Sequence, residues 1–136
     1  MAKLNEIWLI QRTARENNSD TDDIFLLEMQ SGGERAEFRL AGLPHDEREQ
    51  GRTDQYRFDV RDFEFDDEVL QPGDIRITAT GEDAWLPSSF WVIGRNVNDG
   101  FTLLVARPNW PQTGWFSANP SDVNGQARPT RPLDEL

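Results

Sequence analysis

The amino-acid sequence predicts an all-β fold, a two-sheet antiparallel β-sandwich of about eight strands. Short apolar runs recur at strand length, and no segment carries the sustained i, i+3, i+4, i+7 spacing of an amphipathic helix. Clusters of Gly, Pro, Asn and Asp separate these runs, as hairpin loops and turns require. At 136 residues, the chain has the length of one domain with one core.

Seven apolar runs are expected to form strands. Two of them show clear alternation, because Tyr56, Phe58 and Val60 are separated by charged residues and Ile75 and Ile77 by Arg. Such alternation is typical of antiparallel strands with one buried face. The expected strands are Glu6–Arg12, Asp23–Gln30, Ala36–Leu40, Asp54–Val60, Asp74–Thr80, Phe90–Gly94 and Phe101–Arg107.

The first two expected strands are apolar on both faces. The runs are Trp-Leu-Ile at residues 8–10 and Ile-Phe-Leu-Leu at residues 24–27. A strand without a polar face suits the centre of a sheet, or a surface that a partner covers. The sequence leaves both alternatives open.

The segments between the expected strands carry recognisable turn signals. Ser-Gly-Gly at 31–33 predicts a hairpin loop, Gln-Pro-Gly-Asp at 71–74 a β-turn, and Asn-Asp-Gly at 98–100 a tight hairpin with positive φ. The charged stretch at 44–50 has room for one or two helical turns at most.

We expect residues 1–118 to form the single domain and residues 119–136 to form a polar, loosely packed tail. Residues 119–132 are rich in Pro, Gly, Asn and Ser and carry almost no apolar residue. The apolar run near the N-terminus, Ile7–Ile10, is too short for a signal peptide, and no segment reaches membrane-spanning length. The expected location is therefore cytoplasmic, with peripheral membrane attachment left open.

The composition excludes several classes of function. The balance of 14 Lys and Arg against 25 Asp and Glu gives a formal net charge of −11, and the chain has no basic block. Nucleic-acid binding depends on Lys and Arg neutralising phosphates, so we expect no nucleic-acid partner. An anionic membrane would also repel the chain unless a cation intervened. The absence of Cys excludes disulfides and thiolate chemistry.

No catalytic constellation stands out in the sequence. The single histidine, His45, lies in a charged loop where a solvated side chain is the expected role, and a Ser-His-Asp triad would have no other base. Nucleophile-elbow, phosphate-loop and zinc-protease motifs are also missing. We therefore expect a protein that is not an enzyme.

An acidic loop suggests a calcium site. Asp20, Asp22 and Asp23 lie in a polar loop between two expected strands, and Asp83 follows another. Calcium takes six to eight oxygen ligands, which flexible Asp and Asn loops can provide if the two loops meet. The alternative is that these residues cap turns and keep the surface soluble.

The five tryptophans fall into two groups. Trp8 and Trp91 lie inside expected strands and are expected in the core, whereas Trp85, Trp110 and Trp115 lie in or beside loops. A loop Trp suits a membrane interface, a sugar-binding face or a protein interface, because its apolar ring carries one polar N–H. The alternative is that these rings fold back over the end of the core.

Four segments, taken in order, resemble the PLAT domain, the sandwich module named for polycystin, lipoxygenase and alpha-toxin. The best match is Gly-Arg-Thr-Asp-Gln-Tyr at 51–56, which resembles the family pattern G-x-T-D-x-(F/Y). The others are the acidic loop and strand at 21–30, the strand, Trp loop and aromatic strand at 73–94, and Val-Ala-Arg-Pro-Asn-Trp at 105–110. The pair Asp20-Thr21 reverses the family's Thr-Asp order, which displaces the acidic ligand by one residue.

The resemblance implies a noncatalytic sandwich that docks to membrane lipid or to a protein partner, in some members with calcium in loops at one end. Carried onto this chain, the implied calcium ligands are Asp20, Asp22, Asp23 and Asp83. The implied lipid- or partner-binding residues are Trp85, Leu86, Trp110 and Trp115. The alternative function is a carbohydrate- or protein-binding sandwich that works without calcium.

Overall fold

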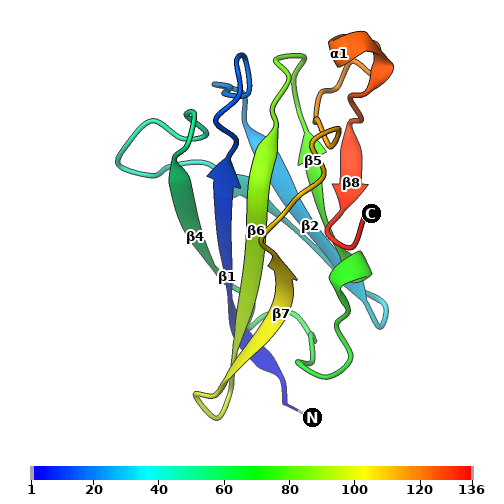
Figure 1. The fold of residues 1–136 in the computed structure, drawn as a ribbon. Helices are drawn as coiled ribbons and strands as arrows, with labels where there is room; N and C mark the ends of the chain where they lie inside the picture. Colours follow the sequence, from blue (N-terminus) through cyan, green and yellow to red (C-terminus); the bar gives the residue numbers. More distant parts are fainter. Residues whose placement is uncertain (1, 136) are drawn as a thin grey trace.

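The computed structural model describes residues 2–135 and shows two four-stranded antiparallel sheets packed face to face (Figure 1). One sheet has the strand order β4-β1-β6-β7 and the other β3-β2-β5-β8. The strands are β1 (Leu4–Thr13), β2 (Phe25–Ser31), β3 (Glu34–Leu40), β4 (Thr53–Asp59), β5 (Ile75–Ala79), β6 (Pro87–Asn96), β7 (Phe101–Arg107) and β8 (Thr130–Pro132). The helical segments are the short η1 (Pro72–Asp74) and α1 (Asp122–Gly125). The predicted sandwich is therefore confirmed.

All seven strands expected from the sequence are present, with their ends shifted by a few residues. β1 and β2 are central strands, since β1 pairs with β4 and β6, and β2 pairs with β3 and β5. The eighth strand, β8, escaped prediction because it is three residues long and has no apolar alternation. It pairs with β5 through Arg76, Ile77 and Thr78.

The prediction of a loosely packed tail beyond residue 118 is wrong. Ala127 and Leu133 are fully buried, and the Leu133 backbone N–H donates to the Ile75 carbonyl at 2.9 Å. The Ala79 N–H donates to the Pro129 carbonyl at 2.7 Å. These backbone hydrogen bonds give the polar segment a place in the sheet that its composition does not reveal.

The core lies between the two sheets and follows the period of two expected for strands. In β1, Ile7 and Leu9 point inward and are fully buried, while Trp8 and Ile10 alternate with them and remain only half-buried. β2 contributes Phe25, Leu27 and Met29 to the same core. Tyr56 and Val60, expected to be inward, are also buried, and Phe58 packs against the core at its edge.

The motif at 51–56 is architectural. Gly51 takes a φ of +72°, the left-handed conformation that favours glycine. Asp54 is fully buried and accepts hydrogen bonds from the Arg48 backbone N–H at 2.8 Å and from His45 Nε2 at 2.8 Å. Arg48 is itself buried and donates to the Leu40 carbonyl at 3.0 Å. The motif thus fixes the charged loop at 44–50 against the end of the sandwich.

Candidate functional site

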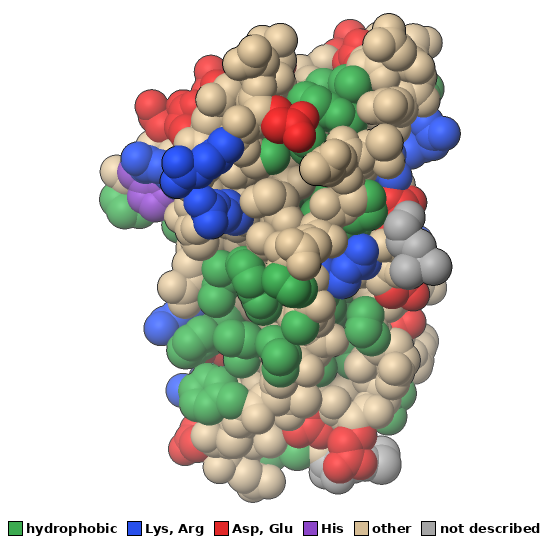
Figure 2. Space-filling model, in the orientation of Figure 1, with side chains coloured by type: hydrophobic (Ala, Val, Ile, Leu, Met, Phe, Trp, Pro, Cys, Tyr) green, Lys and Arg blue, Asp and Glu red, His purple; other side chains and the backbone are tan. Residues whose placement is uncertain are grey.

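The outer face of the β4-β1-β6-β7 sheet exposes a continuous apolar surface. Trp8 pairs with Ile93 across the β1–β6 ladder, Ile10 pairs with Trp91, and Ile93 pairs in turn with Leu103 on β7. Figure 2 shows hydrophobic side chains gathered over these strands in the middle and lower part of this side of the molecule. We call this surface the apolar face; it consists of Trp8, Ile10, Trp91, Ile93, Phe101 and Leu103.

The outer face of the opposite sheet is polar. The residues that β2, β3 and β5 place on it are charged, hydroxylated or amide side chains, and Leu26 is the one large apolar side chain that β2 contributes to it. Glu28 lies beside Arg76 there, with 3.6 Å between carboxylate and guanidinium. An antiparallel sheet normally covers one face with core and presents the other to water, as this second sheet does. The apolar face is the exception in the molecule.

On the apolar face, Trp8 and Trp91 are half-buried, whereas the β7 residues Phe101 and Leu103 project into solvent. Arg57 stacks its guanidinium over the Trp8 ring at 4.1 Å, and Phe101 meets the same ring edge-on at 5.4 Å. Phe101 is 58% exposed and Leu103 is 59% exposed. The prediction that Trp8 and Trp91 belong to the core is wrong, because their strand positions alternate with the inward-facing ones.

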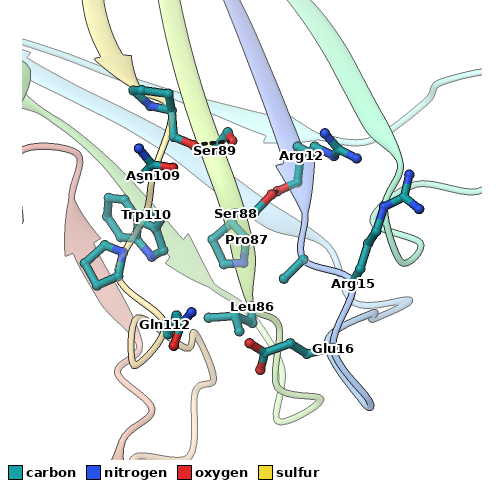
Figure 3. Close-up of a pocket in the computed structure, with 13 residues that line it drawn as sticks. Arg12, Arg15, Glu16, Leu86, Pro87, Ser88, Ser89, Asn109, Trp110 and Gln112 are labelled. Atoms are coloured by element: carbon teal, nitrogen blue, oxygen red, sulfur yellow. Dashed lines mark hydrogen bonds between the residues drawn. The ribbon is translucent and has the colours of Figure 1, made fainter.

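A groove of about 670 Å³ continues from the upper end of the apolar face. Figure 3 shows Arg12 and Arg15 on one side of it and Asn109 and Trp110 on the other. Arg12 pairs with Ser89 in the β1–β6 ladder, one step beyond the Ile10–Trp91 pair on the same face. The groove and the apolar face therefore form one surface, which sequence reasoning missed because it needs the pairing of β1 with β6.

The residues expected to bind lipid or a partner are buried. The exposed fractions are 0% for Trp85, 1% for Leu86, 4% for Trp110 and 8% for Trp115. Trp85 Nε1 donates to Thr13 Oγ1 at 2.9 Å, and Trp110 Nε1 donates to the Gly114 carbonyl at 3.0 Å. Their polar atoms are thus paired inside the fold, and the expectation of exposed loop rings is corrected: the rings close the end of the core.

The two acidic loops do meet. The Thr21 hydroxyl donates to the Asp83 carboxylate at 2.9 Å, and the Asp83 backbone N–H donates to the Asp23 carboxylate at 2.9 Å. Within residues 2–135, however, no three His, Cys, Asp or Glu side chains are grouped so as to hold a metal ion. The carboxylates of Asp23 and Asp83 accept hydrogen bonds from the chain itself, and calcium binding by these loops stays a prediction.

Several carboxylates lie close together beside these loops. Partial burial raises the pKa of Glu49 above its ordinary value, and the neighbouring carboxylates of Asp20, Asp22 and Asp46 raise the pKa further. His45, expected to be solvated, instead contacts the buried Asp54 while its side chain stays 37% exposed. Its contact explains its place in the loop without a catalytic role.

Residues 2–135 include no helix with the length and apolar character that a bilayer crossing requires. No protein-family model matches the chain, and no curated protein matches it.

Solved structures with the same fold are found. Alpha-toxin from Clostridium absonum matches at 21% identity with a TM-score of 0.68, covering 85% of this chain and 30% of the toxin. Alpha-toxin from an avian strain of Clostridium perfringens matches at 18% identity with a TM-score of 0.59, covering 74% of this chain and 30% of the toxin.

A lipoxygenase matches at 18% identity with a TM-score of 0.57, covering 82% of this chain and 15% of the enzyme. The chain therefore spans less than a third of each of these proteins, and the likeness concerns one part of each. Alpha-toxin and lipoxygenase give the PLAT domain its name, and the sequence motifs resemble that domain. The structure confirms this resemblance at the level of the fold: the chain is a PLAT-type β-sandwich.

Proposed function

We propose that this chain is a noncatalytic docking module that binds a protein partner through the apolar face. The observation that carries the proposal is the contrast between the two outer sheet faces, one apolar and one polar. A water-exposed sheet face made of large apolar side chains is unfavourable in an isolated protein, so a partner that covers it is the physical explanation. The resemblance to the PLAT fold, a docking module, supports the same function.

The composition of the apolar face suits a protein interface. Trp, Phe and Arg are enriched in the centres of protein–protein interfaces, and Lys, Asp and Glu are depleted there. Trp8, Trp91 and Phe101 provide the aromatic surface, and Arg57 lies over one of the rings. Charged residues lie at the lower edge, where Glu6 pairs with Asp59 and with Arg95. This arrangement supports an apolar centre with a charged rim.

Two other partners are less well supported. An anionic bilayer would experience the charge of the whole molecule, which is −11. A sugar ring would need an open aromatic face, but Arg57 lies over the Trp8 ring at 4.1 Å. The buried loop tryptophans provide neither a lipid anchor nor a sugar platform. A protein surface with complementary shape needs neither feature.

The test compares variants of the projecting edge of the apolar face with a matched control. Phe101→Glu with Leu103→Glu places two charges on the face, and Val69→Glu places one charge at another exposed apolar residue, which is 46% exposed. A partner isolated on immobilised wild-type protein, identified and purified, should bind the double variant at least about tenfold more weakly and the control unchanged. Equal binding by all three proteins would overturn the proposal.

Two further measurements would identify a different binding partner for the apolar face. Sedimentation with phosphatidylcholine vesicles, with and without phosphatidylserine, would identify a membrane if wild-type protein binds and the double variant does not. Analytical ultracentrifugation would identify a second copy of the chain if wild-type protein dimerises and the double variant stays monomeric. Either result would contradict a separate protein partner.

Calcium binding by the acidic loops stays a prediction of the sequence. If Asp20, Asp22, Asp23 and Asp83 bind calcium, millimolar calcium raises the melting temperature of the wild type but not of Asp83→Asn. The matched control is Asp122→Asn, which lies in α1. An unchanged wild-type melting temperature would remove the prediction.

A further inference from the structure

We infer that the groove above the apolar face holds an acidic, partly apolar segment of the protein partner. This inference rests on the proposed function and deepens it, because it names the chemistry of the segment that occupies one end of the surface. The groove follows the apolar face without interruption along β1 and β6, from the Ile10–Trp91 pair to the Arg12–Ser89 pair.

The groove concentrates positive charge in an acidic protein. Among the residues that line it, Arg12 and Arg15 are basic and Glu16 is acidic, so its formal charge is 2 − 1 = +1, against −11 for the chain. The Arg15 side chain packs over Gly51, where an added Cβ would approach its Nε to 3.0 Å. Arg15 therefore reaches toward the turn that precedes β4.

The guanidinium groups of this groove are available to a ligand. Within residues 2–135, the side chains of Arg12 and Arg15 form no hydrogen bond or ion pair with another residue. Arg48 and Arg131, by contrast, are buried and hydrogen-bonded to backbone carbonyls. Guanidinium groups pair well with carboxylates, which supports an acidic ligand.

Further donors line the opposite wall. Asn109 and Gln112 are exposed, and their side-chain amides form no hydrogen bond within the described residues. Figure 3 shows Glu16 and Gln112 together at one end of the groove beside Leu86, away from the two arginines. A carboxylate in the groove therefore has donors on both walls, and the single acidic side chain lies at one end.

The rest of the wall is apolar. Pro108 and Pro111, which follow β7, line the groove, as do Ala14 and Pro87. A ligand with carboxylates alone would leave these rings uncovered, whereas a segment that also carries apolar side chains would cover them. The groove thus fits a mixed acidic and apolar segment.

Charge geometry favours a protein segment over an anionic membrane. At physiological salt, charges separated by more than about 8 Å are largely screened. A segment lying in the groove is close to Arg12 and Arg15, whereas a planar membrane would also approach surface outside the groove of a chain whose net charge is −11. The segment is therefore attracted by the two arginines and is screened from the acidic surface farther away.

The test measures binding of the labelled protein to an array of short random peptides. The groove variant Arg12→Gln with Arg15→Gln removes its two positive charges. The control Arg35→Gln with Arg39→Gln removes the same charge from exposed positions of β3 on the polar outer face. Circular dichroism and melting temperature verify that both variants are folded.

Wild type and control should prefer peptides that combine Asp or Glu with apolar residues. The groove variant should lose this preference and bind the best peptides roughly tenfold more weakly, with less dependence on salt. A preference for basic peptides, no preference at all, or equal loss in both variants would overturn the inference. Binding of wild-type protein to phosphatidylserine vesicles that the groove variant abolishes would also overturn it, in favour of a membrane.

The array and the partner assay separate this inference from the proposed function. If the purified partner loses binding to Phe101→Glu with Leu103→Glu but keeps full affinity for the groove variant, the docking function stands and the acidic segment is refuted. If the acidic preference depends on the arginines while the apolar-face variant binds the partner normally, the groove is an acidic-ligand site and the docking proposal fails.

Discussion

At the scale of single residues, Gln11 is the clearest conflict between side chain and surroundings. It lies in β1 between the inward-facing Leu9 and Thr13 and is fully buried. Neither its side-chain nitrogen nor its oxygen has a hydrogen-bond partner among the described residues. Burying an unpaired amide costs about 1–3 kcal/mol in proteins, so this position lowers the free energy of unfolding.

Replacing Gln11 with Met should therefore stabilise the protein. The side chains have similar size, and the variant removes the unpaired polar atoms, so we expect a gain of about 1–2 kcal/mol in urea-induced unfolding. Gln55→Met, at an exposed position of β4, is the matched control and should change stability by less than about 0.5 kcal/mol. A Gln11→Met protein less stable than wild type would show that the amide has a partner in solution.

Tyr56 links a single hydroxyl to the pH dependence of stability. Burial raises its pKa well above the ordinary value of 10.0, and the hydrogen bond that it donates to the Glu47 carboxylate raises the pKa further. Arg48 Nη1 donates to the same hydroxyl at 3.0 Å. Because the folded-state pKa is raised, the stabilisation is fully present below pH 10.0 and is lost as the pH rises.

The expected alkaline loss of stability is up to about 1.4 kcal/mol per pH unit above the unfolded-state pKa. Tyr56→Phe should be less stable than wild type by about 1–3 kcal/mol near neutral pH and should lack this alkaline component. Urea unfolding of both proteins at about pH 8 and about pH 11 measures the difference. An equal loss of stability in both proteins would assign the alkaline effect to another group.

At the scale of elements, β8 shows how the chain end completes the second sheet. Leu133, directly after the strand, is fully buried, and Arg131 within it donates to the Trp115 carbonyl at 3.0 Å. The last strand therefore joins the sheet to the segment that carries Trp115. The composition of this segment predicts a loose tail because its buried residues are isolated from one another by polar residues.

Leu133→Ala should destabilise the protein by about 2–5 kcal/mol, because it leaves a cavity against the core. Thr130→Ala in the preceding strand is the control: its exposed hydroxyl bonds to Thr78 Oγ1 at 2.9 Å, and its loss should cost less than about 1 kcal/mol. Denaturant titration separates the two results. If the Leu133→Ala protein is as stable as the control, the expectation of a loosely packed tail is supported.

The aromatic cluster at the end of the sandwich explains why the loop tryptophans are structural. Trp85 packs on Phe25 at 4.9 Å, and Trp110 meets Phe90 edge-on at the same distance. Both sheets contribute to this cluster, since Phe25 belongs to β2 and Phe90 to β6. Loops rich in Pro and Gly mark these rings as surface residues in the sequence, but the rings lie between the sheets.

Trp85→Ala should therefore cost about 3–5 kcal/mol in the free energy of unfolding. Trp91→Ala is the matched control, because it removes the same side chain from the half-buried apolar face. Its cost should be clearly smaller. Thermal unfolding followed by circular dichroism compares the two, and equal costs would mean that the two rings share one environment.

At the scale of the whole molecule, local patterns predict the fold better than they predict the site. Period-two alternation and turn residues locate the strands, because they depend on neighbours in the sequence. The apolar face depends on ladder pairing between distant strands, as in Trp8 with Ile93 and Ile93 with Leu103. The doubly apolar run at 8–10 is a local signal of it, because a strand that is apolar on both faces suits a surface that a partner covers.

The positions of the charged groups on the surface also depend on the fold and cannot be read from the local sequence. The net charge of −11 predicts no basic site, yet folding brings Arg12 and Arg15 to one groove and assembles the acidic loops elsewhere. Net charge therefore describes solubility and long-range repulsion, and the binding surface depends on the local balance.

Site-specific photocrosslinking tests the docking claim most directly. Benzoylphenylalanine replaces Phe101 on the apolar face in one protein and Val69 in the other; the two side chains are 58% and 46% exposed. Crosslinking in the native cells should yield one protein adduct at position 101, identified by mass spectrometry and able to rebind in purified form, with none at position 69. Lipid adducts alone at position 101, or the same adducts at both positions, would contradict a protein partner on the apolar face.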